Sequence, residues 1–292
     1  MGREFFDQFP AAAERFRQAD EALGHSLSRV MFEGPEEELT RTSRCQPALY
    51  LHGLVGLELL RERVPGLEVG ACAGLSLGEF TAHAAAGTFD FATGLRVVEQ
   101  RGLFMEQACE ASEGSMAAMI GGEEADVMRL AEACGVEVAN FNAPGQVVVS
   151  GDRGGIDQAV ARAREFGIRL AKPLAVAGAY HSRLMTPARE QLAAVLKEVD
   201  LRAPERPVWC NVDARPVNGP DDIRDTLVRQ VTGSVRWVEC IRGLIGSGHS
   251  RFVEFGPGRV LGGMLARIDK SVEVHQVEDV ASLDATVAAL MP

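Results

Sequence analysis

The sequence has little lysine, no closely spaced cysteines and no long apolar run, and each absence excludes a class of protein. Only three of the 30 basic residues in this 292-residue chain are lysines, against 41 acidic residues, so the formal net charge is −11. A surface of that charge repels phosphate backbones, which excludes nucleic acid as an expected partner. Because arginine is abundant, any single arginine needs its own argument before it is given a function.

The six cysteines form no C-x-x-C pair and no short metal-ligand spacing. In a chain of this length that distribution predicts reduced thiols in a cytoplasmic protein, with no disulfide framework and no metal site. The longest apolar stretch, residues 49–60, contains His52 and Glu58, and it is shorter than the roughly 18 uncharged residues of a membrane helix. Residues 1–9 are partly acidic and lack the apolar core of a signal peptide. We therefore expect no membrane contact.

The remaining composition is that of a globular protein with a sizeable core. Hydrophobic residues make up 46% and charged residues 24% of the chain, close to the average for soluble domains. Helical patterns open the chain, and Pro47 is expected to begin an apolar helix through Leu60. Residues 67–73 form a short apolar run typical of a buried strand, and helical patterns follow it. A strand followed by helices is typical of an α/β fold.

Beyond residue 113 the pattern changes to short strands that alternate with helices. The order strand, helix, strand, strand, helix, strand over about 65 residues is typical of a ferredoxin-like unit. The earlier pattern resumes after His181. We therefore predict that residues 114–179 form a small inserted domain, and that residues 1–113 and 180–292 together form the large domain.

The segment Gly74-Leu75-Ser76-Leu77-Gly78 lies between the predicted strand and a helix. In this context G-x-S-x-G favours a nucleophile elbow, because the glycines permit a sharp turn that exposes the serine hydroxyl at the end of the strand. The helix N-terminus that follows also favours developing negative charge. Glycine and serine form ordinary turns as well, so the pattern alone leaves a simple turn as the alternative to a nucleophilic Ser76.

A nucleophilic serine needs a base, and His181 is the best candidate among the six histidines. It lies between small residues where the chain returns from the inserted segment. The other five lie in helices, in a loop or near a late strand, where packing or surface roles are usual. A helix-capping or interdomain histidine is the alternative for His181. No acidic residue between Ser76 and His181 stands out as the third member of a triad, which leaves a backbone carbonyl to orient the imidazole.

Six motifs then carry a resemblance that covers nearly the whole chain. They are GLSLGEF at 74–80, QRGLFMEQA at 100–108, NFNAPGQVVVSG at 140–151, GAYHSRLM at 178–185, LVRQ at 227–230 and VEFGPGRVL at 253–261. Their order and spacing are similar to those of malonyl-CoA:acyl carrier protein transacylases. The resemblance implies an α/β-hydrolase-like large domain with a parallel central sheet and an inserted ferredoxin-like domain, which agrees with the pattern described above.

The resemblance also implies roles for individual residues. Ser76 matches the nucleophile that is acylated, and His181 matches its base. Gln230 matches the residue whose main-chain carbonyl orients this histidine, and the main-chain N–H of Leu77 matches an oxyanion donor. Arg101 matches the arginine that holds the free carboxylate of the malonyl group. A planar guanidinium suits that task because it makes two parallel hydrogen bonds to a carboxylate, although without the motif Arg101 would be interpreted as a solvated helix residue.

Three further positions are interpreted through the same resemblance. Gln46 and Asn142 match polar residues that line the acyl cleft, and a helix cap or a turn side chain is the alternative for each. Leu75 departs from the usual pattern, which has histidine inside the elbow. We expect this leucine to change the shape or hydration of the acyl pocket, and with it the strictness for malonyl.

A second departure concerns the first residues. Members of the family open with a strand that ends in a loop resembling F-P-G-Q-G-x-Q, and residues 1–9 resemble the segment directly after that loop. The loop supplies a second oxyanion N–H, and the loss of one such donor costs about 10²–10³ in turnover. We therefore expect either that an internal methionine was taken as the start or that the protein is truncated and less efficient.

The function implied by the resemblance is malonyl transfer from coenzyme A to the phosphopantetheine thiol of holo acyl carrier protein, in fatty-acid synthesis. It implies a monomer and no cofactor, since the coenzyme A thioester is itself a substrate. A serine thioester hydrolase and a degenerate member that binds without catalysis are the alternatives. Because such carriers are acidic, docking predicts a local basic patch, for which Arg183 and Arg189 are the candidates.

Overall fold

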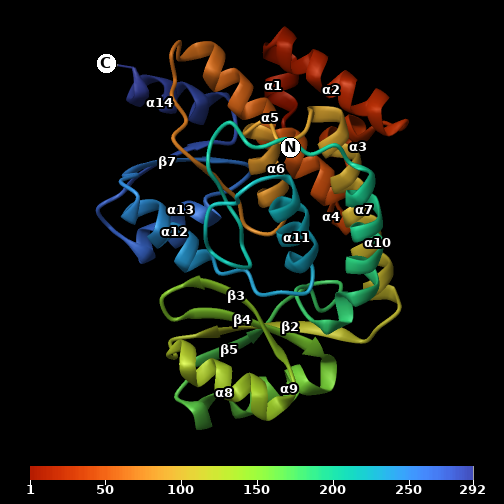
Figure 1. Ribbon diagram of the computed structural model, residues 1–292, viewed down its shortest axis with the longest axis vertical. Helices are drawn as coiled ribbons and strands as arrows, with labels where there is room; N and C mark the ends of the chain where they lie inside the picture. The colour runs from red at the N-terminus through yellow and green to blue at the C-terminus, as the bar shows by residue number, and fades with distance from the viewer. Residues whose placement is uncertain (292) are drawn as a thin grey trace.

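The computed structural model describes residues 1–291 and has a large part with a smaller sheet below it (Figure 1). Five helices open the chain: α1 (Arg3–Gln8), α2 (Pro10–Leu23), α3 (Leu27–Glu33), α4 (Glu36–Thr40) and α5 (Thr42–Arg63). The buried rings of Phe5 and Phe16 join them to the main hydrophobic core. The helix that was expected to begin at Pro47 is α5, which begins earlier and contains that proline. Its first turn packs on Gly102, where an added Cβ would lie 2.6 Å from the carbonyl oxygen of Thr42, so tertiary packing outweighs the local effect of the proline.

The large part contains two parallel strand pairs. β1 (Cys72–Ala73) pairs with β6 (Val208–Trp209), and β7 (Arg251–Phe255) pairs with β8 (Glu273–Val277). A cavity of about 1010 Å³ is lined by both β1 and β7. The strand expected over residues 67–73 is shorter than predicted, because residues 67–71 border this cavity and pair with no other strand in residues 1–291.

Seven helices lie around these strands (Figure 1). They are α6 (Leu77–Ala85), α7 (Phe91–Glu110), α10 (Thr186–Glu198), α11 (Pro220–Gln230), α12 (Trp237–Gly246), α13 (Val260–Ile268) and α14 (Val280–Leu290). α7 packs between α5 and α10, and α6 begins directly after β1. This arrangement places the N-terminus of α6 at the carboxyl ends of β1 and β6, the usual position of a site in an open α/β sheet.

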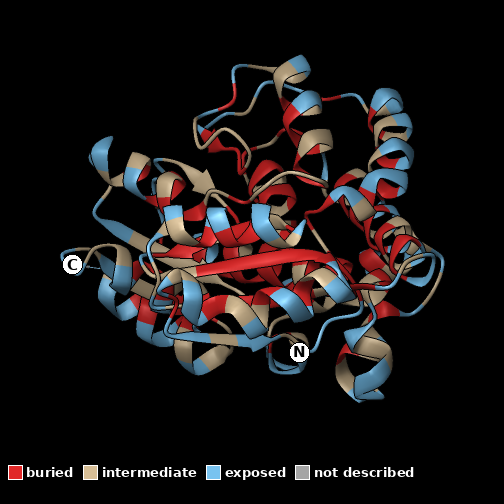
Figure 2. Ribbon diagram, turned by 90° about the horizontal axis from the view of Figure 1, so that it is seen from below, coloured by how far each residue is buried: buried red, intermediate tan, exposed pale blue. Residues whose placement is uncertain are grey.

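The smaller sheet contains four antiparallel strands in the order β3-β4-β2-β5. Its elements are β2 (Gly114–Ile120), α8 (Glu124–Cys134), β3 (Glu137–Ala143), β4 (Gln146–Asp152), α9 (Arg153–Arg162) and β5 (Leu170–Pro173). Both helices bury one face and expose the other (Figure 2). This sheet with α8 and α9 has a hydrophobic cluster of its own. The domain boundaries at residues 114 and 179 stay a prediction.

The smaller sheet touches the large part along β3. Phe141 donates its main-chain N–H to the carbonyl of Val235, and the N–H of Val235 donates to the carbonyl of Ala139. Val235 lies between α11 and α12, so the edge of the small sheet is fixed close to the end of α11. The carboxyl end of α11 is therefore held between the two parts of the chain.

Candidate active site

The turn between β1 and α6 has the geometry of a nucleophile elbow. Ser76 is the N-cap of α6 and has φ 53° and ψ −107°, a strained conformation for a residue with a side chain. Gly74 faces Gly78 so closely that an added Cβ would lie 2.0 Å from the backbone of Gly78. Glycine at position 74 is therefore required for the chain to turn this sharply, and the turn presents the Ser76 side chain at the end of the strand.

His181 lies beside this serine, although 104 residues separate them in the chain. Its Nε2 is 2.8 Å from Ser76 Oγ, and its Nδ1 is 2.9 Å from the main-chain oxygen of Gln230. A carbonyl oxygen only accepts, so Nδ1 carries the proton and Nε2 is left to accept from the serine. His181 also has a left-handed φ of 57°. The three groups form the geometry of a serine, a base and an orienting carbonyl.

The electrostatics of the site keep this histidine neutral. Burial, and to a smaller extent the nearby Arg101 charge, lower the pKa of His181 to about 4, although hydrogen bonds to the backbone at Gln230 and Gly233 oppose the shift. An imidazole that is neutral at physiological pH can accept the proton of Ser76. Gln230 is the last residue of α11, so the partial negative charge of that helix end stabilises the imidazolium that forms.

Arg101 is buried, with 1% of its surface exposed, and reaches Ser76 from α7. Its Nη2 donates to Ser76 Oγ at 3.1 Å and to the side-chain oxygen of Gln230 at 2.9 Å, and its Nη1 donates to Gln46 Oε1 at 2.5 Å. Its Nε has no partner in residues 1–291. Burial lowers the pKa of Arg101 to about 10, which still leaves it charged at neutral pH. A buried cation with an unused N–H beside a nucleophile suits an acyl group that carries a carboxylate.

The helix that follows Ser76 supplies an oxyanion donor. Leu77 is the first residue of α6, and the first N–H groups of a helix have no intrahelical partner. The main-chain N–H of Leu77 donates to no acceptor in residues 1–291. It is therefore free to bind the oxygen that becomes negative when Ser76 attacks a carbonyl.

The family model of the acyl transferase domain matches residues 1–289 of the chain. The chain belongs to the acyl transferase family. Malonyl CoA-acyl carrier protein transacylase of Bacillus subtilis (strain 168) is 38% identical to it, over 99% of this chain and 92% of that protein. The crystal structure of malonyl-CoA:acyl carrier protein transacylase from Xanthomonas oryzae pv. oryzae is 38% identical and has a TM-score of 0.95, over 99% of this chain and 93% of that one.

This family member is also similar to a chain in the structure of a type II PKS acyl-carrier protein in complex with its malonyl-transacylase. It is 35% identical with a TM-score of 0.95, and the match covers 99% of this chain and 94% of the other. These comparisons confirm the predicted family and the predicted fold, an α/β-hydrolase-like large domain with an inserted ferredoxin-like domain.

In this acyl transferase family member, the elbow is held by a residue that the sequence reasoning missed. Asn211, in the loop after β6, is fully buried. Its Oδ1 accepts the N–H of Ser76 at 2.7 Å, and its Nδ2 donates to the carbonyl of Gly74 at 2.8 Å. The side chain therefore satisfies two main-chain groups on either side of the strained turn. An asparagine near the end of a short apolar segment was the only sequence signal, and such asparagines are common in turns.

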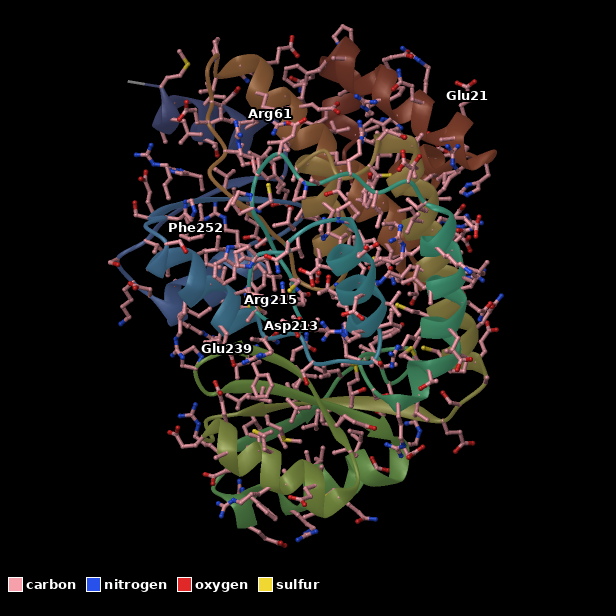
Figure 3. All side chains as sticks on the ribbon, viewed as in Figure 1. Glu21, Arg61, Asp213, Arg215, Glu239 and Phe252 are labelled. Atoms are coloured by element: carbon pink, nitrogen blue, oxygen red, sulfur yellow. The ribbon has the colours of Figure 1, made fainter. Side chains whose placement is uncertain are left out.

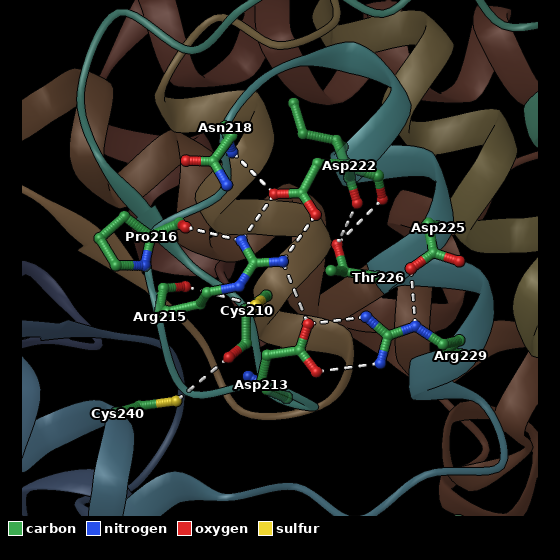
Figure 4. Close-up of polar contacts among 12 residues, drawn as sticks. Cys210, Asp213, Arg215, Pro216, Asn218, Asp222, Asp225, Thr226, Arg229 and Cys240 are labelled. Atoms are coloured by element: carbon green, nitrogen blue, oxygen red, sulfur yellow. Dashed lines mark hydrogen bonds and ion pairs between the residues drawn. The ribbon is translucent and has the colours of Figure 1, made fainter.

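A network of ion pairs fixes the segment between Asn211 and α11 (Figure 4). Arg215 donates to both oxygens of Asp222, each at 2.7 Å, and Arg229 donates to both oxygens of Asp213 at 2.9 and 2.7 Å. Asp213 and Arg215, labelled in Figure 3, come from the loop that follows Asn211. Paired forks of this kind set the position of the end of α11, and hence of the carbonyl that contacts the histidine.

The other predicted residues are placed differently. Gln46 contacts Arg101, so its side chain holds the guanidinium. Asn142 lies buried on β3 of the small sheet and makes no hydrogen bond with the Ser76 network; its Oδ1 has no partner in residues 1–291. Leu75 packs in the hydrophobic cluster around α12 and lines the large cavity. Neither Ser76 nor His181 lines that cavity.

Of the two arginines in the predicted basic patch, Arg183 and Arg189, the first is paired with acids. Its guanidinium pairs with Glu137 of β3 and with Asp152 of β4, so its charge is already compensated. In residues 1–291 no three histidine, cysteine, aspartate or glutamate side chains gather as a metal site. Within the same range, each helix is either too short or too polar to span a bilayer.

Proposed function

We propose that this chain transfers a malonyl group from coenzyme A to the phosphopantetheine thiol of acyl carrier protein, through a malonyl ester on Ser76. The observation that supports this proposal is a buried arginine within hydrogen-bond distance of a serine that is itself paired with a neutral histidine. A serine and a histidine alone do not select one acyl group over another. The buried arginine favours an acyl group that ends in a carboxylate, because the two charges are opposite.

In the first half of the reaction, Ser76 Oγ attacks the thioester carbonyl of malonyl-CoA while His181 Nε2 takes the hydroxyl proton. The main-chain N–H of Leu77 donates to the oxygen that becomes negative. When the C–S bond breaks, His181 returns its proton to the departing thiolate. The products are a malonyl ester on Ser76 and free coenzyme A.

In the second half, the thiol of the carrier's phosphopantetheine arm gives its proton to His181 and attacks the ester. The C–O bond breaks, and His181 returns the proton to Ser76 Oγ. Two successive transfers through one covalent intermediate predict ping-pong kinetics. The same residues act in both halves, and the scheme needs no cofactor.

Arg101 gives this scheme its selectivity. The malonyl carboxylate would receive hydrogen bonds from the guanidinium, which holds the thioester carbonyl beside Ser76. An acetyl group leaves the buried cation without that partner, so the site disfavours it. Gln46 and the side chain of Gln230 hold the guanidinium from two sides.

Intact mass spectrometry tests the proposal directly. Incubation with malonyl-CoA should add about 86 Da to the protein, the mass of a malonyl ester, and Ser76→Ala should remain unmodified. Holo acyl carrier protein should then discharge the adduct and gain the same mass. Absence of the adduct would favour a binding protein without catalysis, and rapid loss of the adduct to water, with no transfer to the carrier, would favour a thioester hydrolase.

A further inference from the structure

A carboxylate without a role in the two transfer steps lies buried behind the nucleophile. Glu79 is in the first turn of α6, three residues after Ser76, and none of its surface is exposed. Its Oε2 accepts the main-chain N–H of Asn211 at 3.0 Å and the side-chain N–H of Gln230 at 2.7 Å. Its Oε1 has no partner in residues 1–291. A carboxylate is rarely buried so completely unless it has a charged partner.

The side chain of Gln230 connects this carboxylate to Arg101. Its Oε1 accepts from the Nη2 of Arg101 at 2.9 Å, and its Nε2 donates to Glu79 and to the main-chain oxygen of Ser76. A guanidinium only donates and an ionised carboxylate only accepts. Both neighbours therefore impose the same orientation on the amide, and the main-chain carbonyl of the same residue accepts from His181 Nδ1.

Two charged side chains near Glu79 shift its pKa in opposite directions. Arg101 on α7 lowers the pKa of Glu79, and Asp213 in the loop after β6 raises it. Burial raises the pKa of the Cys210 and Cys240 thiols, and the negative charge of Glu79 raises both further. These thiols therefore stay neutral. Burial is the largest effect on Glu79 and raises its pKa to about 7. The carboxyl group is thus poised to change charge near neutral pH, and Arg101 is the cation that favours its ionised form.

We propose that Glu79 is a positioning and selectivity residue of the acyl site, which holds Arg101 through Gln230 and competes with the malonyl carboxylate for the charge of that arginine. The inference rests on the function proposed above. A malonyl carboxylate placed on Arg101 brings a second negative charge toward Glu79. Binding of malonyl should therefore raise the pKa of Glu79 and draw a proton onto it.

The sign of the pH effect is set by linkage. If carboxylate binding raises the pKa of Glu79, protonation of Glu79 must strengthen carboxylate binding by the same factor. Malonyl-CoA should therefore bind more tightly below the pKa of Glu79 than above it. For two carboxylates screened by a shared guanidinium we expect about a three- to tenfold change in affinity across the transition. Acetyl-CoA has no free carboxylate and should show no such change.

Isothermal titration of the Ser76→Ala variant, which cannot be acylated, measures this coupling. Malonyl-CoA is titrated near pH 7 in two buffers with different ionisation enthalpies, which gives the number of protons taken up. Acetyl-CoA in the same buffers corrects for the phosphates of coenzyme A. We expect more proton uptake with malonyl-CoA than with acetyl-CoA, and no difference between the two in Ser76→Ala/Glu79→Gln. Equal uptake in the variant that keeps Glu79 would overturn the inference.

Turnover of three single variants separates this role from a purely structural one. Glu79→Leu removes both hydrogen bonds and should lower kcat about 100-fold with either donor, as misplaced catalytic groups do. Glu79→Gln keeps an oxygen for both donors and should restore most of that loss, but its KM for malonyl-CoA should no longer rise as the pH passes 7. Asp20→Asn is the matched control, because Asp20 accepts a main-chain N–H far from the site; it should behave as wild type.

The outcomes keep the two proposals distinct. If malonyl-CoA fails to bind Ser76→Ala at all, the proposed function fails. If it binds without excess proton uptake, or if Glu79→Gln keeps the wild-type pH dependence of KM, the function stands and the role of Glu79 is refuted. Should Glu79→Leu fail to fold, the titrations with Glu79→Gln still decide.

Discussion

Replacing Arg101 with alanine tests the assignment of acyl selectivity. The guanidinium is buried and donates to Gln46, Gln230 and Ser76. Alanine removes the charge and the fork together. Arg101→Lys is the matched variant, since it keeps a positive charge but cannot make two parallel hydrogen bonds to one carboxylate. Comparing the two separates the contribution of charge from that of geometry.

The size of the effect depends on the contacts that the malonyl carboxylate would make. A hydrogen bond to a charged group contributes about 1.5–3 kcal/mol, so two give about 3–6 kcal/mol before the cost of ordering the substrate. Arg101→Ala should therefore lower kcat/KM for malonyl-CoA about 10²–10³-fold, a loss of roughly 3–4 kcal/mol in transition-state stabilisation. The value for acetyl-CoA should fall less than about tenfold, because that donor gains nothing from the fork.

The assay is the second-order rate constant of adduct formation on Ser76, which equals kcat/KM for the donor and is obtained by quenched-flow mass spectrometry at low concentrations of each donor. Thermal unfolding of every variant is the control, since Arg101→Ala leaves the side-chain oxygens of Gln46 and Gln230 without a donor. Arg101→Lys should lie between wild type and alanine for malonyl-CoA. An equal loss for both donors in a folded Arg101→Ala protein would remove the arginine from its selectivity role.

The geometry of the site supports three further predictions. Asn211→Ala leaves the N–H of Ser76 and the carbonyl of Gly74 without their partner. The free energy of unfolding, measured in urea, should therefore fall by about 2–4 kcal/mol, and acylation should slow by at least about tenfold. Unchanged stability would contradict the role of Asn211 in the elbow. Gly74→Ala would place a Cβ 2.0 Å from backbone atoms, so we expect insoluble or inactive protein in an expression test, and a folded, active variant would refute the tight turn. The pKa of His181 is lowered to about 4, and only the neutral imidazole accepts a proton. Acylation by acetyl-CoA should therefore fall as the pH drops through that value. A midpoint near 6.5, in protein that circular dichroism shows to be folded, would refute a buried, neutral base.

Much of the fold could be predicted because its signals are local. The alternation of strand and helix after residue 113 and the apolar run before Gly74 each depend on neighbouring residues; the structure contains the alternation, and it contains the last two residues of the apolar run as β1. The lengths of the central strands could not be predicted, because a strand is defined by its partner. Residues 67–71 have no partner strand within residues 1–291 and border a cavity.

The site was predictable where a motif fixes the residue type. Ser76, Arg101 and His181 were found in this way, and the structure brings their side chains together. Asn211 and Glu79 were missed, because their partners lie 132 or more residues away in the chain. Glu79 lies within the motif GLSLGEF, but the motif does not show which groups its carboxylate contacts. The docking patch stays a prediction: Arg183 is paired with two acids of the small sheet, and the sequence does not show such pairing.

The last residue of α11 orients the histidine through its backbone and holds Arg101 through its side chain. His181 contacts the main-chain oxygen of Gln230, and all twenty amino acids carry that oxygen, so no codon change at this position can delete it. The critical variable for the histidine is where the helix stops. A mutation that extends or unwinds α11 by one residue would misalign the base without altering any residue that touches it.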